Sequence, residues 1–182
     1  MSRLGNHPIV VPEGVEVSIK GSKVTVKGPK GEMGITLPDG ITAEMDDGAL
    51  QVSRRNDTRG QKMYHGTYTR HLRNMVNGVS TGHSKSLIVN GKGYQAEVVG
   101  KVIEMQIGFS HKVLVEIPEG VEVEVKPGQN TFTLELRSND KYLVGTFADV
   151  LYKLRPVEPY NMIGFRYSDQ RVKTKTAKIV TT

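Results

Sequence analysis

Residues 37–41 read Leu-Pro-Asp-Gly-Ile, and residues 117–121 read Ile-Pro-Glu-Gly-Val. A third stretch of this kind is Pro-Glu-Gly-Val-Glu-Val at residues 12–17. The same six residues recur at 118–123, where they overlap the second stretch. Proline followed by an acidic residue and glycine is typical of a tight turn between two strands. The turns that punctuate one part of the chain therefore recur in another part, which suggests an internal repeat.

The repeat extends beyond these turns in the same order along the chain. Gly66-Thr67-Tyr68 matches Gly145-Thr146-Phe147, and Leu72-Arg73 matches Leu154-Arg155. Single Pro-Asp-Gly turns recur in any β-rich chain, but matches that keep their order across a whole unit favour a duplication. We therefore expect two similar domains and a tail, with boundaries at residues 1–82, 83–158 and 159–182.

Each unit begins with apolar residues that alternate with polar ones, which is the period of a half-buried β-strand. Glycines and Asp-Gly pairs separate these stretches, as turns between antiparallel strands require. The alternating positions are Val15/Val17/Ile19, Val24/Val26, Ile35/Leu37, Ile41/Ala43/Met45 and Leu50/Val52 in the first unit, and Leu87/Val89, Tyr94/Ala96/Val98, Val102/Met105/Ile107, Val113/Val115/Ile117, Val121/Val123/Val125 and Phe132/Leu134/Leu136 in the second.

A helical period follows the strands in each unit. In the first unit Tyr64, Tyr68, Leu72 and Val79 recur at steps of three or four, together with Met75 and Val76, so they share one face. In the second unit Phe147, Leu151 and Leu154 do the same, after Tyr142 or Leu143. The predicted fold class is α+β, with two similar tandem domains, each an antiparallel sheet covered by one helix, and an extended basic C-terminal tail.

Capping residues give the expected helix ends. Asn56 or Asp57 is expected to cap the first helix, and Gly78 or Gly82 to end it. The second helix has cap candidates at residues 138–140 and is expected to end before Pro156, which lacks an amide hydrogen.

Composition excludes several classes of protein. The 182 residues include no cysteine, which rules out disulfides, thiolate metal sites and cysteine nucleophiles. No run reaches the ~20 apolar residues of a membrane span, and the first residues lack the apolar region of a signal peptide. We expect a cytoplasmic protein with no membrane partner.

The net charge of +6 is unevenly distributed. Residues 54–73 hold six basic residues and one acidic residue, and residues 153–182 hold seven basic and two acidic residues. Together these segments carry +10, so the rest of the chain is mildly acidic. Positive charge concentrated in this way favours a polyanionic partner over a merely solvated surface. Because Tyr68 and Leu72 mark the buried face of the first helix, Arg70 and Arg73 are predicted to face away from the core, toward a partner or solvent.

No arrangement of residues predicts catalysis, a metal or a cofactor. His65 and His71 lie six residues apart and do not share a helix face. Ser110 and His111 are adjacent, so on a strand they point to opposite faces. Gly91-Lys92-Gly93-Tyr94 lacks the ending of a phosphate-binding loop and is read as a tight turn with Lys92 at its tip, where the lysine could also contact phosphate. An enzyme with a small-molecule substrate is therefore the least supported class.

The C-terminal segment combines aromatic residues with cations. Tyr160, Phe165 and Tyr167 interleave with Arg155 and Arg166, and four cations follow at Arg171, Lys173, Lys175 and Lys178. Cations bind phosphates, while tyrosine and arginine planes stack on unpaired bases. The sequence predicts an extended RNA-binding tail, and the alternative is a basic tail without structure.

The chain resembles the bacterial-type large-subunit ribosomal protein six family over nearly its whole length. The resemblance rests on the Met-Ser-Arg start, Pro8 to Pro12, the turn at residues 91–94, Gly108-Phe109-Ser110-His111, and Arg155 through Tyr167 with its lysine-rich end. Relatives usually read Glu-Pro-Tyr-Lys-Gly-Lys-Gly near residue 160. This chain keeps Glu158-Pro159-Tyr160 and Gly164 but has Asn161-Met162-Ile163 between them. Two lysines are missing, so their phosphate contacts cannot be transferred to it.

The resemblance implies a non-catalytic constituent of the large ribosomal subunit. Its partners would be 23S rRNA near the sarcin–ricin loop and the base of the factor-binding stalk, and neighbouring large-subunit proteins. A nucleic-acid-binding module outside the ribosome is the alternative. The resemblance, the charge pattern and the turn at residues 91–94 together predict an RNA-binding set of Lys92, Lys153, Arg155, Tyr160, Gly164, Arg166, Tyr167, Arg171, Lys173, Lys175 and Lys178.

Overall fold

The repeated turns form where the sequence places them. In the computed structural model, which describes residue 5, residues 7–46 and residues 48–176, the amides of Val15, Ile41 and Val121 donate to the carbonyls of Pro12, Pro38 and Pro118, each at 3.2 Å. The glycine of each turn has a φ of 82° to 84°. That left-handed conformation is the reason glycine occupies the third position of a type II turn.

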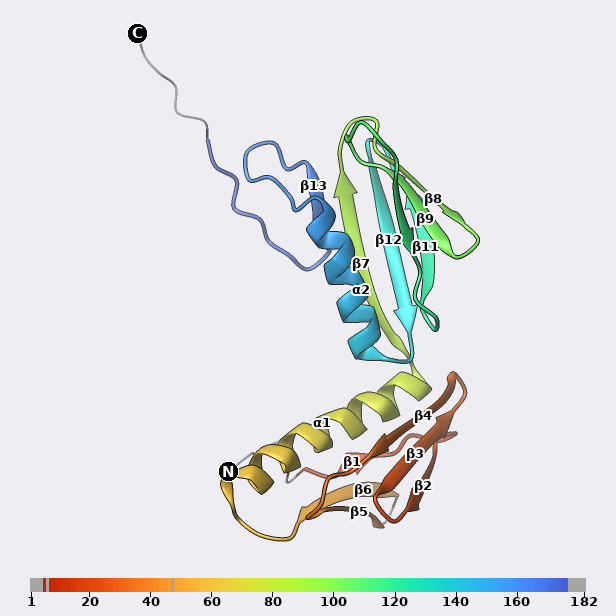
Figure 1. Cartoon of the computed structure of the whole chain (residues 1–182), viewed down its shortest axis with the longest axis vertical. Coiled ribbons are helices and arrows are strands. Elements are labelled where there is room, and N and C mark those ends of the chain that lie inside the picture. Colours follow the sequence, from red (N-terminus) through yellow and green to blue (C-terminus); the bar gives the residue numbers. More distant parts are fainter. Residues whose placement is uncertain (1–4, 6, 47, 177–182) are drawn as a thin grey trace. The chain divides into compact units, whose positions relative to one another are not determined.

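The chain divides into two compact units, Met1–His83 and Ser84–Thr182 (Figure 1). Unit 1 contains β1 (Ile9–Val10), β2 (Glu16–Lys20), β3 (Lys23–Gly28), β4 (Gly31–Thr36), β5 (Ile41–Asp46), β6 (Ala49–Arg54) and α1 (Arg59–Ser80). Unit 2 contains β7 (His83–Asn90), β8 (Gln95–Val99), β9 (Val102–Gln106), β10 (Val113–Glu116), β11 (Glu122–Pro127), β12 (Thr131–Ser138), α2 (Lys141–Leu154) and β13 (Gly164–Tyr167).

Both units are α+β, and the predicted fold class is confirmed. The strands of each unit nevertheless divide between two sheets where the sequence predicted one. Unit 1 has sheets in the order β1-β6-β5 and β2-β3-β4, and unit 2 has β11-β12-β7-β13 and β10-β9-β8. Each unit thereby encloses its own apolar core, centred on residues such as Leu50 and Leu72 in unit 1 and Leu134 and Leu151 in unit 2.

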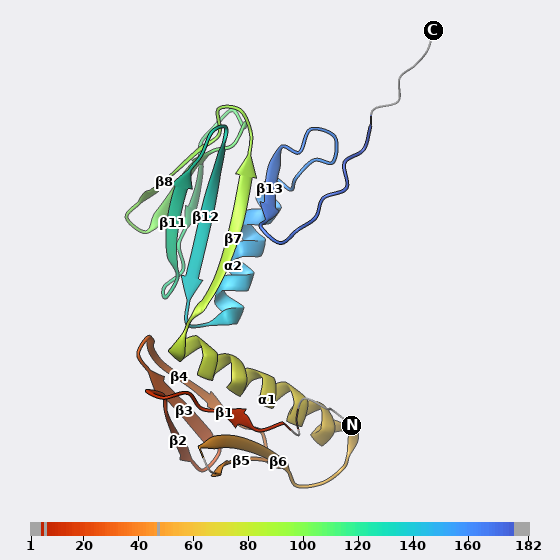
Figure 2. The ribbon, with the colours of Figure 1, turned by 180° about the vertical axis from the view of Figure 1, so that it is seen from behind.

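Strand β13 lies within the segment that the sequence analysis treated as a tail. It pairs antiparallel with β7, so that Phe165 lies opposite Val89, and Figure 2 shows it beside β7 and α2. Phe165 is fully buried in the core of unit 2. The tail prediction missed this strand because four residues between turns carry too short an alternation to be distinguished from extended chain.

The two helices differ in the residues that cap them. Asp140 caps α2, since its carboxylate accepts the amide of Tyr142 at 2.8 Å. The predicted caps Asn56 and Asp57 are wrong for α1, whose cap residue is Thr58 without a side-chain bond. Gly78 lies inside the helix, whereas Gly82, with a φ of 80°, follows the cap Thr81 and ends it as expected.

The placement of Phe165 makes β13 a structural strand. Truncating a buried phenylalanine removes its contacts and leaves a cavity. We expect Phe165→Ala to lower the free energy of unfolding of unit 2 by about 3–5 kcal/mol, measured by hydrogen exchange of the β7 and β12 amides. Tyr160→Ala, which truncates an aromatic ring that is 53% exposed, is the control, with an expected loss below about 0.5 kcal/mol. Equal losses in the two variants would contradict this role.

Candidate RNA-binding surface

Three loops meet at one end of unit 2, around the side chain of Arg155. The guanidinium of Arg155 donates to the carbonyl of Ile107 at 2.7 Å. Its central carbon lies 5.5 Å from the ring centre of Tyr94 and 5.6 Å from that of Phe109. Cation–π contacts of this length are favourable. Arg155 therefore joins the 91–94 loop, the 107–111 loop and the end of α2.

Glycines allow these loops to approach one another. A Cβ atom at Gly91 would lie 2.4 Å from the ring of Tyr94, and one at Gly108 would lie 2.5 Å from a guanidinium nitrogen of Arg155. Gly108 also has a φ of 79°. Gly-Lys-Gly-Tyr and Gly-Phe-Ser-His are thus packing motifs, in which Gly91 leaves room for the ring of Tyr94 and Gly108 leaves room for the guanidinium of Arg155.

The 107–111 loop presents a stacked pair of rings. Phe109 and His111 lie nearly parallel, 6.0 Å apart with 14° between their planes. Phe109 is 43% exposed although it is apolar. An exposed aromatic ring beside an arginine and a second ring is a surface on which a base can stack. Sequence reasoning missed Tyr94, Phe109 and His111 as site residues, although the two glycine–aromatic motifs mark their positions.

The loop that contains Asn161-Met162-Ile163 is closed by backbone bonds. The amide of Glu158 donates to Ile163 at 2.9 Å, and the amide of Met162 donates to Glu158 at 2.9 Å. The amide group of Asn90 donates to the carbonyl of Met162 at 3.0 Å. This loop therefore has a defined shape without the lysines of the usual motif, and it holds Tyr160 in an exposed position.

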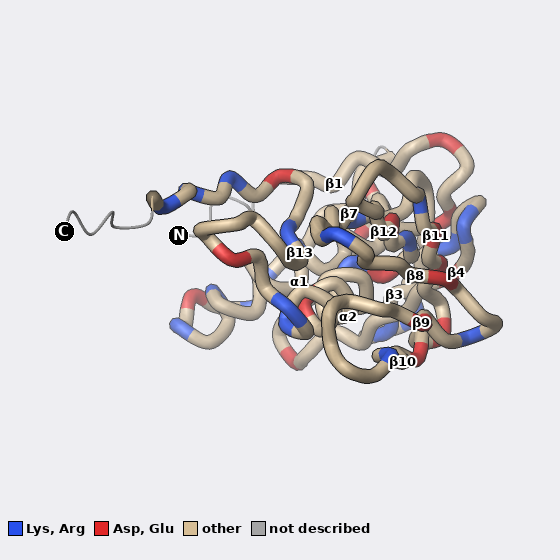
Figure 3. Tube along the Cα trace, turned by 90° about the horizontal axis from the view of Figure 1, so that it is seen from above, with Lys and Arg blue, Asp and Glu red and all other residues tan. Residues whose placement is uncertain are grey.

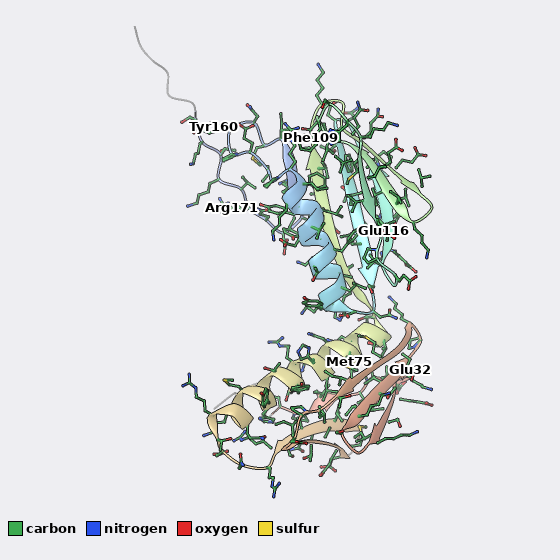
Figure 4. All side chains as sticks on the ribbon, in the orientation of Figure 1. Glu32, Met75, Phe109, Glu116, Tyr160 and Arg171 are labelled. Carbon is green, nitrogen blue, oxygen red and sulfur yellow. The ribbon has the colours of Figure 1, made fainter. Side chains whose placement is uncertain are left out.

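The chain after β13 returns to this loop. The amide of Lys175 donates to the carbonyl of Pro159 at 3.1 Å, which places Lys175 beside the Tyr160 loop. Arg171, labelled in Figure 4, lies earlier in the segment that leads to this contact. Figure 3 shows these basic positions along the chain that leads to the C-terminus. Figure 4 also places Tyr160 and Phe109 toward the same end of unit 2, away from Glu116.

The predicted site residues fall into two groups in the structure. Lys92, Tyr160, Arg171, Lys173 and Lys175 are exposed, and Arg166 is half-buried. Within the described residues no carboxylate pairs with any of the five cations in this group, because the ion pairs of unit 2 involve other side chains. Lys178 lies outside the described residues. Uncompensated cations beside exposed aromatic rings form a surface suited to a polyanion that carries flat bases.

The second group holds the surface in place. A Cβ atom at Gly164 would lie 2.7 Å from the carbonyl oxygens of Arg155 and Pro156, so only glycine fits there. Tyr167 stacks on Tyr152 with ring centres 5.3 Å apart. Burial is the main cause that raises the pKa of Tyr167, and the nearby carboxylate of Asp149 adds to it. Arg155 and Tyr167 are therefore positioned for packing more than for direct contact.

Lys153 is exposed but paired. Its ammonium lies 2.6 Å from the carboxylate of Asp149, one helical turn away. The hydrogen bond to Asp149 and the charge of that carboxylate raise the pKa of Lys153. An RNA phosphate would have to compete with this carboxylate, so Lys153 is a weaker candidate than the unpaired cations.

Of the histidines, His83 contacts backbone and His111 contacts a ring. A ring nitrogen of His83 lies 2.9 Å from the carbonyl oxygen of Asn74, and His111 stacks on Phe109. The described residues contain no group of three His, Asp or Glu side chains that could hold a metal ion. Among the helices described, none has the length and apolar character to cross a bilayer.

The sequence matches a known family along both units. The sequence model of the family Ribosomal protein L6 matches residues 11–82 and 90–168. The chain belongs to the ribosomal protein L6 family. The two matched segments agree with the internal duplication, and membership makes the chain a ribosomal protein and not an enzyme. The second match ends at residue 168 and so includes β13, Gly164 and Tyr167.

Individual relatives agree over their full length. The chain is 37% identical to the large ribosomal subunit protein uL6 of Gloeobacter violaceus, over 98% of both chains. It is 40% identical to that of Anaeromyxobacter dehalogenans, again over 98% of both. Identity to that of Alkalilimnicola ehrlichii is 43%, over 98% of this chain and 99% of the relative.

Arg155 should order the 107–111 loop. A lysine keeps the charge but loses the flat guanidinium that bonds Ile107 while it stacks on Tyr94 and Phe109. We expect Arg155→Lys to raise the hydrogen-exchange rates of the amides at residues 108–111 by about tenfold, which corresponds to roughly 1.4 kcal/mol of local stability. Arg171→Lys, which changes an exposed arginine, should leave these rates unchanged. An effect of equal size in both variants would contradict the prediction that Arg155 orders the 107–111 loop.

Proposed function

We propose that the chain is a structural constituent of the large ribosomal subunit in the cytoplasm and binds 23S rRNA near the sarcin–ricin loop and the base of the factor-binding stalk. The observation that carries this proposal is the set of unpaired cations and exposed rings at one end of unit 2. Family membership adds support, because the relatives are named large ribosomal subunit proteins.

The surface divides recognition between charge and stacking. Arg166, Arg171, Lys173 and Lys175 would bind phosphates, which supplies affinity and makes it depend on salt. Phe109 and Tyr160 would stack on bases that are unpaired and turned out of an RNA helix. Proteins recognise such bases because the edges of paired bases lie in a major groove too deep and narrow for side chains. Lys92 extends the basic surface to the 91–94 turn. Nothing in this division requires a reacting group.

The charge distribution of unit 2 gives the protein an orientation on RNA. Glu116 lies away from the loops around Phe109 (Figure 4), and Glu119 is exposed and pairs with Lys101 at 3.6 Å. Phosphates repel carboxylates, so an RNA that approaches unit 2 is drawn to its basic end. We propose that the acidic side faces solvent or neighbouring large-subunit proteins.

The Asn161-Met162-Ile163 sequence changes how this loop would bind. With no lysine at these positions, the loop would contribute Tyr160 and its backbone shape, and the neighbouring segment with Lys173 and Lys175 would supply the charge. The bond from the amide of Lys175 to Pro159 places that charge beside the loop.

A salt titration with an rRNA fragment that contains the sarcin–ricin loop tests the proposal. Changing Arg166, Arg171, Lys173 and Lys175 together to glutamine should make the slope of log affinity against log salt shallower by roughly 3, because each phosphate contact contributes about 0.7 to 0.9. The control changes Lys20 and Lys23, exposed cations of unit 1 with no ion pair among the described residues, and should leave the slope unaltered.

Sedimentation of cell extracts separates this proposal from a nucleic-acid-binding module outside the ribosome. We expect the chain to sediment with the large-subunit peak. If the four-residue variant kept its slope, the surface assignment would be wrong. If the protein were absent from the large-subunit peak, the ribosomal role would be wrong.

A further inference from the structure

Helix α1 carries positive charge that the core of unit 1 does not need. The helix runs for 22 residues and contains Arg59, Lys62, Arg70 and Arg73 but no aspartate or glutamate. Its buried face is formed by other residues, among them Leu72, Met75 and Val79. Arg70 is exposed and Arg73 half-buried, which agrees with the prediction that neither faces the core.

The four cations share one face of the helix. They lie at positions −7, −4, +4 and +7 relative to Gly66, and residues at these spacings lie within about 40° of the direction of Gly66 around a helix of 3.6 residues per turn, so together they span about 80°. We call these four residues the α1 stripe. From Arg59 to Arg73 the stripe extends for about 21 Å at 1.5 Å per residue, which is long enough to meet several phosphates of one strand.

Little within the protein neutralises the stripe. Among the described residues, one carboxylate contacts it, that of Asp57, which lies 3.6 Å from Lys62. Asp57 is held more closely by Arg54, at 2.8 Å, and that hydrogen bond is the main cause that lowers its pKa. Arg73 donates at 3.5 Å to a neutral acceptor, the carbonyl of His7. The stripe therefore keeps nearly all of its positive charge.

The duplicated helix shows that the fold does not require this charge. Gly66 corresponds to Gly145 in the repeat, and the helical register set by this pair places Leu72 opposite Leu151, both fully buried. The sequence comparison matched Leu72-Arg73 with Leu154-Arg155 instead, three residues out of this register. In the helical register the stripe positions correspond to Ser138, Lys141, Asp149 and Tyr152. That set is one cation and one anion, and Asp149 is paired with Lys153 at 2.6 Å. The two units thus differ in charge at these positions, of which Ser138 ends β12 and Tyr152 stacks on Tyr167 of β13 in unit 2. A difference that folding does not explain points to a ligand of unit 1.

We infer that the α1 stripe binds the phosphate backbone of RNA, as a second RNA contact carried by unit 1. The inference rests on the proposed function only in taking RNA as the polyanion. Three of the four cations are arginines, whose planar donors match phosphate oxygens. Between them lie Gly66, which has no side chain, and Met63, which is 58% exposed. One apolar side chain is a poor centre for a protein interface, so RNA is the better match.

The direct test uses the purified full chain and a 20-base-pair RNA duplex as the probe. Arg59→Gln with Arg70→Gln removes two exposed cations that have no ion pair among the described residues. The slope of log affinity against log salt should become shallower by about 1.4 to 1.8, so the loss of affinity between 50 and 200 mM salt should shrink about tenfold.

The matched control is Lys20→Gln with Lys23→Gln, which removes the same charge from the exposed ends of β2 and β3 and should leave the slope unchanged. Equal changes in both double variants would mean that net charge alone matters, and the inference would be overturned. The tail variants of unit 2 report separately on the proposed function, because they leave the stripe intact.

A cross-link identifies the partner in the assembled particle. The chain has no cysteine, so Met63→Cys offers a single thiol for a photoreactive group within the stripe, and Ser18→Cys on β2 serves as the control. In large subunits that carry the labelled protein, we expect a cross-link to rRNA from position 63 and none from position 18. A cross-link from position 63 to protein alone, or to nothing, would contradict the inference.

Discussion

Unit 2 depends on the contacts of one residue, Arg155, at the point where helix α2 ends. Its carbonyl accepts the amide of Phe165 at 2.8 Å and so holds strand β13 beside the helix end. Its guanidinium bonds the carbonyl of Ile107 and lies against Tyr94 and Phe109. A half-buried arginine needs such partners, because an unpaired charge away from water is costly. The same contacts that satisfy Arg155 therefore bring the candidate RNA-binding loops together.

The duplication separates what folding requires from what function adds. Both units use the same turn of proline, acidic residue and glycine, the same order of strands before helix, and one helix with a buried apolar face. Their exposed surfaces diverge, since α1 carries four cations on one face while α2 carries an internal ion pair. Because exposed charges contribute little to stability, each copy was free to acquire a different surface.

Strands and helices were predicted correctly where the spacing of apolar residues forms a clear local pattern. Alternation of apolar and polar residues located the strands from β2 to β12 but not β1. The three-to-four spacing around Leu72 and Leu151 located both helices with their buried faces. Prediction failed at the cap of α1, where Asn56 and Asp57 interact with Thr58, Arg54 and Lys62 instead of with the helix amides. It also failed at β13, whose four residues make a strand only because β7 offers an edge.

The class of fold and the duplication were readable from the sequence, because the spacing and order of residues along the chain carry them. The charge distribution indicated a polyanionic partner, and the resemblance of whole motifs indicated the family. Only the tertiary structure decided which residues of the site are free to bind. Arg155, Gly164 and Tyr167 hold the fold, Lys153 is paired, and Phe109 and His111 join the surface. Exposure and pairing are properties of neighbours in space, and such neighbours can lie far apart along the chain, as Asn90 and Met162 do at a separation of 72 residues.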